Sequence, residues 1–310
     1  MLLDEKRTKR LARIMAVFTA VAFLGGGVVL VLVSVFGGSS SSTSQLVSAA
    51  QAQVKSQPTS ALAWDGLANA YQASNNVPAA IAAAQHAQKL DPADQTSAFT
   101  LVNLYTQTGQ SAQALSVLEA YTAKNPTDPT GLLQLGQSAD QSGLGALAYS
   151  SYMKYLSLTP TGATSVAVRA HLPIVAKIRD AQARTTANPK DAAAWHALAA
   201  AFQTEQNAAG SITAAVQAAA LAPTNIQYMV HLATIYKETS QPPQAVLAAA
   251  RYTKRNPKNP PGYFYLGTYA QQAGQKAVAR AAFTTYLRLA PNGSHAKSAQ
   301  ASLTKLGTGT

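Results

Sequence analysis

Residues 263–291 read YFYLGTYAQQAGQKAVARAAFTTYLRLAP, and this stretch decides the fold. Its apolar residues recur three and four positions apart, as Tyr263, Leu266 and Ala270 do, which is the spacing of one face of a helix. A second apolar run follows after a glycine. Pro291 ends this run, because proline cannot continue the interior of a helix. The stretch is therefore predicted to form a pair of helices.

The same pattern occurs six times along the chain. The prolines that end the units follow one another at a constant interval, at Pro92, Pro126 and Pro160 and again at Pro223, Pro257 and Pro291. The six units cover 61–94, 95–128, 129–162, 192–225, 226–259 and 260–293. One helix pair cannot bury its apolar face alone, whereas stacked neighbours can. The predicted fold is therefore an all-α solenoid of six helix pairs.

The six units fall into two blocks of three, because the whole pattern occurs a second time further along the chain. Trp64 matches Trp195, and Pro92 matches Pro223 at the same separation. We call this separation, from Trp64 to Trp195, the block offset. Block 1 is predicted over 45–175 and block 2 over 176–310. Lone helices are expected at the block ends, over 45–56, 164–171, 177–187 and 295–306, and the last of these is a C-terminal cap.

The joint between the blocks departs from the regular interval. Pro189 follows Pro160 sooner than one closing proline follows another within a block, and Pro173 lies between them. The joint is either a shortened repeat that continues one superhelix or a hinge between two lobes, and the sequence leaves both open.

The N-terminal segment predicts a membrane anchor. Residues 14–36 contain no charged residue, and a helix of that length rises roughly 34 Å, enough to cross the hydrocarbon core. Residues 1–13 carry five cations, and the next cation is Lys55. The positive-inside rule then places the N-terminus in the cytoplasm and the repeats outside the cell membrane.

Two further expectations concern this segment. Residues 37–44 contain only glycine, serine and threonine, so they are predicted to form a flexible linker. The alternative to a single-pass anchor is a cleaved signal peptide. A cut near Gly37 or Gly38 would release the same domain on the same side of the membrane.

The repeat resembles the tetratricopeptide repeat family. The first unit shows the family's aromatic–x2–Leu–Gly/Ala–x2–Tyr start at Trp64, Leu67, Ala68 and Tyr71, and a closing proline follows at the family's spacing. The sequence departs from the family at Ser211, where an alanine is usual. The resemblance implies a surface that binds a protein or peptide.

In this family the first helix of each pair lines a concave groove. The positions matched here carry mostly amide side chains, which offer both donors and acceptors to a peptide main chain. The resemblance implies that the partner-binding residues are Asp65, Asn69, Gln72, Phe99, Asn103, Gln107, Gln137, Asp140 and Gln141 in block 1, and His196, Gln203, Lys237, Phe264 and Gln271 in block 2. The cations with which some members hold acidic chaperone tails are missing. Asp65 stands where the first lysine would be, and Thr130 and Gln134 replace the later cations.

The composition argues against catalysis and against a cofactor. The chain has no cysteine, and it lacks the glycine-rich phosphate loop, the zinc-protease motif and the nucleophile elbow. His196 and His231 belong to neighbouring first helices, but the sequence offers no obvious third ligand for a metal. We therefore predict a protein that is not an enzyme and holds neither metal nor cofactor.

The charge is unevenly distributed. Residues 37–162 carry 4 cations and 6 anions, whereas residues 163–310 carry 15 cations and 4 anions. The basic block 2 is either a solvated face or a contact for an anionic surface or an acidic partner. Nucleic acid is not expected, because the repeats are predicted to lie outside the cytoplasm and the aromatic residues are used in the core.

The sequence thus predicts a non-enzymatic, membrane-anchored scaffold that binds a protein or peptide, in keeping with the assembly of an envelope complex. Two alternatives stay open. One is a self-assembling spacer at the membrane, which would be a homo-oligomer. The other is a repeat subunit of the kind found in cytochrome c maturation.

Overall fold

The computed structural model describes residues 40–307 of the protein, and their side chains from residue 43. The predicted basic segment over 1–13 and the predicted membrane span over 14–36 lie outside these residues. Within 40–307, no helix combines the length and the apolar character needed to cross a membrane.

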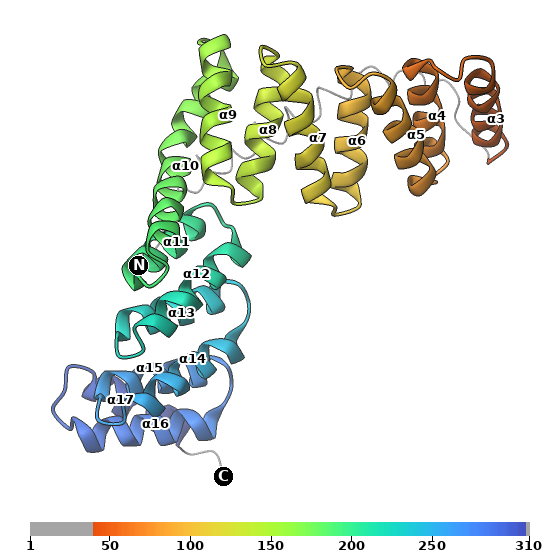
Figure 1. The fold of residues 1–310 in the computed structure, drawn as a ribbon. Coiled ribbons are helices and arrows are strands. Elements are labelled where there is room, and N and C mark those ends of the chain that lie inside the picture. The colour runs from red at the N-terminus through yellow and green to blue at the C-terminus, as the bar shows by residue number, and fades with distance from the viewer. Residues whose placement is uncertain (1–39, 308–310) are drawn as a thin grey trace. The chain divides into compact units, whose positions relative to one another are not determined.

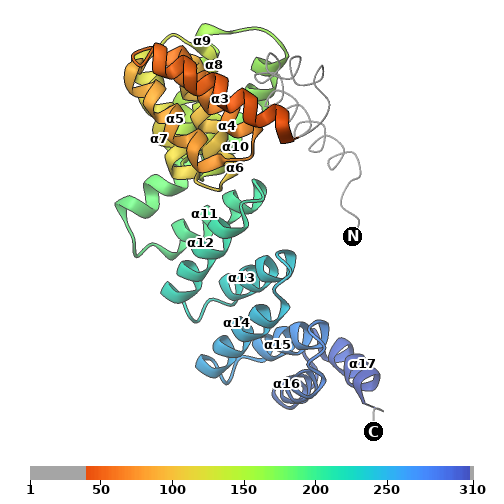
Figure 2. The ribbon, with the colours of Figure 1, turned by 90° about the vertical axis from the view of Figure 1, so that its right-hand side faces the viewer.

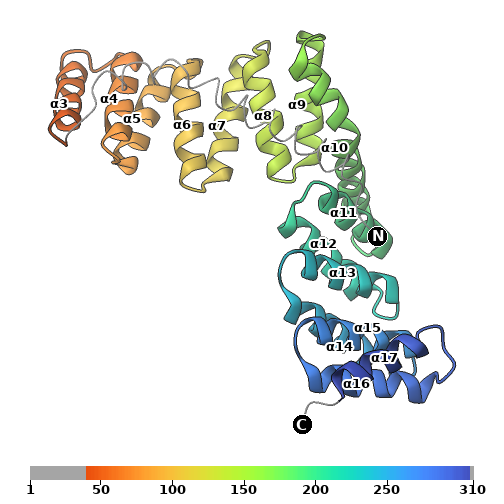
Figure 3. The same cartoon turned by 180° about the vertical axis from the view of Figure 1, so that it is seen from behind.

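The described residues divide into two compact units, one ending at Pro173 and the other beginning at Ile174, and each is described by itself. The described residues contain helices and no strand. The helices of the first unit are α3 Ser40–Ser56, α4 Ala61–Ala73, α5 Val77–Leu90, α6 Gln95–Gln107, α7 Ser111–Lys124, α8 Pro129–Gln141 and α9 Gly145–Leu158. Each packs against the next, so that the helices of this unit follow one another side by side (Figures 1 and 3).

The second unit is built in the same way (Figure 2). Its helices are α11 Ala192–Thr204, α12 Ala208–Leu221, α13 Ile226–Glu238, α14 Pro242–Arg255, α15 Pro260–Gln272, α16 Lys276–Leu289 and α17 Ala296–Leu306. Helix α17 stands where the C-terminal cap was predicted. Helices α4 to α7 and α11 to α14 correspond one to one at the block offset. Within each unit, the all-α solenoid prediction is confirmed.

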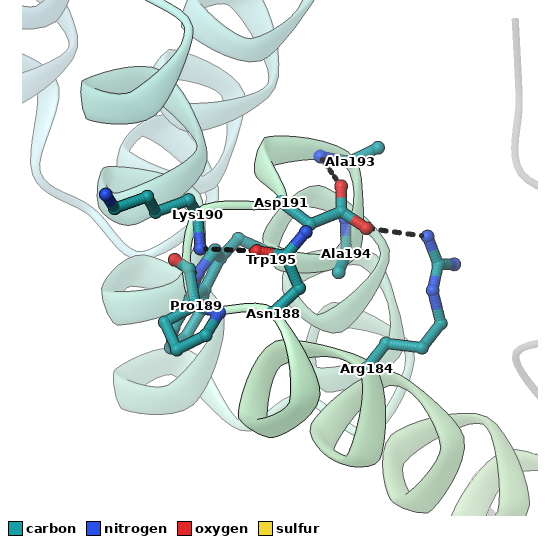
Figure 4. A network of polar contacts seen from close by, with 8 residues as sticks. All are labelled: Arg184, Asn188, Pro189, Lys190, Asp191, Ala193, Ala194 and Trp195. Carbon is teal, nitrogen blue, oxygen red and sulfur yellow. Dashed lines mark hydrogen bonds and ion pairs between the residues drawn. The ribbon is translucent and has the colours of Figure 1, made fainter.

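The first helix of each pair starts at a polar cap. At α11, the Asp191 carboxylate accepts the backbone N–H groups of Ala193 and Ala194 at 2.9 and 3.0 Å, and it pairs with Arg184 at 3.2 Å (Figure 4). These N–H donors, followed by Arg184, hold the pKa of Asp191 below its ordinary value. The Trp195 indole N–H donates to the Pro189 carbonyl oxygen at 2.9 Å, which ties the preceding turn to the helix.

Close packing inside a pair depends on small residues facing aromatic rings. Gly136 of α8 lies against the ring of Tyr152 in α9, and Gly267 of α15 lies against the ring of Phe283 in α16. Both rings are buried, with 1% of each residue exposed. The two contacts are again separated by the block offset, so each unit uses the same device to bring its helices together.

Two expectations for chain connections are corrected. Residues 37–39 of the predicted linker lie outside the described residues, but its residues 40–44 belong to helix α3. Serine lowers helix stability only modestly, and α3 is held by its packing on α4. The two lone helices predicted over 164–171 and 177–187 form one helix, α10 Ala163–Ala187, with Pro173 inside it. Val168 and Val175 are both fully buried, and burial on either side of the proline offsets its helix-breaking cost of about 3 kcal/mol.

Candidate partner-binding surface

Three aromatic side chains meet between α11 and α13 in the second unit. His196 of α11 stacks on Tyr228 of α13, with ring centroids 4.6 Å apart and planes 28° from parallel. His231, one turn further along α13, meets the edge of His196 at the same centroid distance. The sequence predicted that His196 and His231 lie on neighbouring helices, and their rings are in contact.

A chain of hydrogen bonds continues from His231. Its Nε2 lies 2.9 Å from the Gln203 Oε1, and the Gln203 Nε2 donates to the Glu238 Oε2 at 2.5 Å. Because the Gln203 amide nitrogen is directed to Glu238, its oxygen faces the histidine, and the Nε2 of His231 must carry the proton. We call the five residues His196, Gln203, Tyr228, His231 and Glu238 the α11–α13 surface.

The electrostatics of this surface favour neutral histidines. Burial lowers the pKa of His196 below its ordinary value. Burial also lowers the pKa of His231, and the neighbouring His196 lowers it further, whereas Glu238 acts in the opposite direction. The Nδ1 of His231 is buried without a hydrogen-bond partner, so a second proton there would be poorly placed. The surface therefore presents uncharged imidazoles at neutral pH.

The remaining predicted residues of the second unit separate into two groups. Lys237 is exposed, and Gln271 is partly exposed. Phe264, which was predicted to contact a partner, is partly buried. Its ring stacks on His295 at 4.1 Å with an 8° interplanar angle, and it packs against the core of the unit. The capping segment therefore covers part of the Phe264 ring, and the contact of this residue with a partner stays a prediction.

In the first unit, Asp65 was also predicted to face a partner, and its burial contradicts this prediction. The residue is 3% exposed, and the Ser97 hydroxyl lies 2.7 Å from its Oδ2. The same hydroxyl lies 2.9 Å from the Asp94 carboxylate that caps α6. Burial raises the pKa of Asp65 to about 6 against the lowering effect of the Ser97 hydrogen bond, and the Asp94 charge raises it further. Asp65 therefore joins α4 to α6 inside the unit.

Two further predicted residues of this unit make contacts within it, and a third has a buried polar atom. Asp140 pairs with His171 at 2.5 Å, where both side chains are largely buried. Phe99 packs edge-on against Tyr121, with ring centroids 5.4 Å apart. Gln137 is partly exposed, but its amide nitrogen is buried without a partner.

The other predicted residues of the first unit remain accessible on the first helices. Asn103, Gln107 and Gln141 are exposed, and Asn69 and Gln72 are partly exposed. They lie on α4, α6 and α8 and form a polar series without a hydrogen-bonded cluster like the one between α11 and α13.

Sequence reasoning did not assign Tyr228 and His231 to a binding surface. Both stand at repeat positions next to those that the family resemblance selected. A tyrosine and a histidine three residues apart share one helix face, and this spacing is the signal that points to them.

Comparison with known proteins identifies the repeats. Residues 71–133 and residues 231–294 each match a tetratricopeptide repeat family model. No curated protein matches the chain.

Solved structures resemble the chain at low identity. The TPR2AB domain of yeast Sti1 in a pHSP90 complex is 17% identical and has a TM-score of 0.34. The match covers 80% of this chain and 98% of the Sti1 chain. A tetratricopeptide repeat protein from Parabacteroides merdae is 13% identical and has a TM-score of 0.37. The match covers 83% of this chain and 91% of that protein's chain. The Cut9-Hcn1 structure is 14% identical with a TM-score of 0.33, and this chain covers 46% of the chain it matches there.

The matched segments fall one in each compact unit, over helices whose packing has been described above. Repeats of this kind typically serve as scaffolds for protein interactions. The chain therefore contains tetratricopeptide repeats in both of its units.

Proposed function

We propose that the chain is a membrane-anchored scaffold that holds a segment of a partner protein on the α11–α13 surface. The observation that carries this proposal is the hydrogen-bond chain from His231 through Gln203 to Glu238. It fixes an amide and an imidazole before a partner arrives, and this lowers the ordering cost of binding. Lys237 stands exposed beside Glu238 and adds a charge for orienting the partner.

Site-specific crosslinking in the source cells tests the surface. A photoreactive amino acid at Lys237 is expected to capture a partner protein, whereas the same group at Thr284 is not, because Thr284 is an exposed residue of the second helix α16. Gln203→Ala removes the hydrogen bonds to His231 and to Glu238, so capture of the partner by the photoreactive group at residue 237 should fall about tenfold.

The matched control is Thr213→Ala. Thr213 is exposed on α12, and its hydroxyl bonds only to its own helix, so capture at Lys237 should not change. Equal capture from Lys237 and Thr284 would contradict the proposal. A product that contains only this chain would favour the self-assembling spacer instead.

The anchor is a second part of the proposal. Its support is the uncharged stretch over 14–36 behind a basic segment, and the cation excess of residues 163–310 suits a site near an anionic surface. We expect the full-length chain to stay in the membrane pellet after alkaline carbonate washing. External protease should degrade its repeats in intact spheroplasts.

A variant with Val28→Lys and Val29→Lys provides the comparison for the anchor. Two lysines near the centre of the span cost about 5–7 kcal/mol on insertion scales, so this variant should appear in the supernatant. Release of the unaltered chain by carbonate, or protection of its repeats from external protease, would refute the anchor and its orientation.

A further inference from the structure

A cavity of about 190 Å³ lies in the second unit, on the side of the second helices. It is bounded by α12 and α14 and includes residues of α13, which packs against both. Val216 of α12 and Leu247 of α14 line it and remain 39% and 47% exposed, and Met229 of α13 contributes a buried apolar side chain. The α11–α13 surface uses the first helices, so this cavity is a separate feature.

The first unit has different side chains, with a different contact, at the corresponding place. The counterparts of Val216 and Tyr236 at the block offset are Gln85 and Tyr105. The Gln85 amide nitrogen donates to the Tyr105 hydroxyl at 2.6 Å. The side chain of Val216 has no amide group and cannot make this bond. Tyr236 also lines the cavity, and among the described residues no hydrogen bond holds its hydroxyl.

Two other substitutions between the units change the chemistry of this place. Leu247 stands where the first unit has Ser116, and Arg251 stands where it has Ala120. The second unit thus carries a large apolar side chain and a guanidinium at positions where the first unit has small side chains. The repeat architecture is kept by both sets of residues, so folding does not require the apolar and cationic ones.

The charges around the cavity have one sign. Arg251 and Arg255 of α14 line it, both are exposed, and no acidic residue belongs to its lining. A guanidinium matches a carboxylate in geometry and charge, and an apolar surface beside it strengthens such a pair by excluding water. A cavity of about 150 Å³ accepts a benzene ring in another protein, so this one has room for a single large side chain.

We propose that this cavity binds a peptide segment in which a leucine- or phenylalanine-sized side chain stands next to a carboxylate. The apolar side chain enters between Val216 and Leu247, and the carboxylate pairs with Arg251 and Arg255. The Tyr236 hydroxyl and the exposed Gln244 amide offer hydrogen bonds to the main chain of the peptide. A lipid has no peptide main chain, so these two groups favour a peptide as the occupant.

Fluorescence anisotropy with a labelled octapeptide, Gly-Ser-Asp-Leu-Phe-Glu-Gly-Ser, tests the proposal on the full-length protein. Saturable binding with a Kd of about 0.1 mM is expected. Val216→Gln and Leu247→Ser install the residues of the first unit, and each should weaken binding about tenfold while thermal unfolding stays unchanged. Absence of saturation up to about 1 mM would overturn the proposal, as would an unchanged Kd in both variants.

The carboxylate part has its own control. Arg251→Ala should weaken the acidic peptide about fivefold and leave a neutral Asn/Gln version unaffected. Lys254→Ala removes the same charge from the same helix at an exposed residue outside the lining, so it should have little effect. Equal losses in the two variants would show that only the general positive field acts, and this contradicts the proposed pair.

Two other occupants are distinguished by the same samples. If sodium decanoate binds in a Val216-dependent way and the octapeptide does not displace it, the cavity is an acyl-chain site and the peptide proposal is wrong. If Val216→Gln converts a dimer to a monomer in sedimentation, a second copy of the chain is the occupant, and the proposal is likewise wrong.

Discussion

At pH 8, the Asp65→Asn variant is expected to be more stable than the unaltered protein by about 3 kcal/mol. The reason is that burial raises the pKa of Asp65 to about 6 from an ordinary 3.8, so at pH 8 the fold contains a buried carboxylate that it would hold more favourably as the acid. Urea unfolding of both proteins between pH 4 and pH 8 measures the difference.

The geometry explains why a proton belongs at Asp65. The Ser97 hydroxyl has one proton, yet it lies within hydrogen-bond distance of both the Asp65 and Asp94 carboxylates. With both carboxylates ionised, one of these contacts has no proton. A protonated Asp65 donates to the Ser97 oxygen, and the Ser97 hydroxyl then donates to Asp94. The amide nitrogen of an asparagine donates in the same way at every pH.

The sign of the pH dependence follows from the two pKa values. Between pH 3.8 and about 6 the folded protein binds the Asp65 proton more tightly than the unfolded chain does, so the stability due to Asp65 rises as the pH falls through about 6. The advantage of Asp65→Asn should therefore be nearly constant above about pH 7, shrink as the pH falls through about 6, and be mostly lost at pH 4. An advantage that stays constant with pH would show that Asp65 has the same pKa in the folded and the unfolded protein, and this contradicts the prediction.

Asp65 also marks a limit of the sequence reasoning. The spacing of the repeats predicted the helix pairs, because apolar periodicity and closing prolines are local signals. The exposure of position 65 depends on Ser97, which is 32 residues away, and on how tightly α4 approaches α6. The repeat position of Asp65 lines the groove in other members of the family, but in this protein Asp65 is buried against Ser97. The spacing of the repeats alone does not predict this contact.

The sequence indicated part of the α11–α13 surface but did not indicate the cavity. His196 and Gln203 were assigned from their repeat positions, and they lie in the α11–α13 surface. The cavity beside Val216 was not predicted, because an alanine-rich second helix reads as ordinary close packing. Only the comparison of Val216 with Gln85, and of the contacts each one makes, distinguishes the two units at this place.

Gly267→Ala is expected to destabilise the protein by about 1–3 kcal/mol, although alanine is the better helix former. A Cβ atom at residue 267 would lie 2.7 Å from two ring carbons of Phe283. Phe283 is 1% exposed and belongs to the core of the second unit, so its ring cannot turn away into solvent. Urea unfolding followed by circular dichroism measures the loss.

A matched glycine and a compensating change separate this clash from a general effect of alanine. Gly66 of α4 has open space where its Cβ would lie, so Gly66→Ala should stabilise the protein by about 0.5–1 kcal/mol through helix propensity. Phe283→Leu removes the ring that the new methyl group meets. Adding Gly267→Ala to Phe283→Leu should therefore cost much less than adding it to the unaltered chain. Additive losses in the double variant would mean that contacts other than the one between Gly267 and Phe283 set the distance between α15 and α16. The packing of a glycine on an aromatic ring would then not be what brings the helices of a pair together.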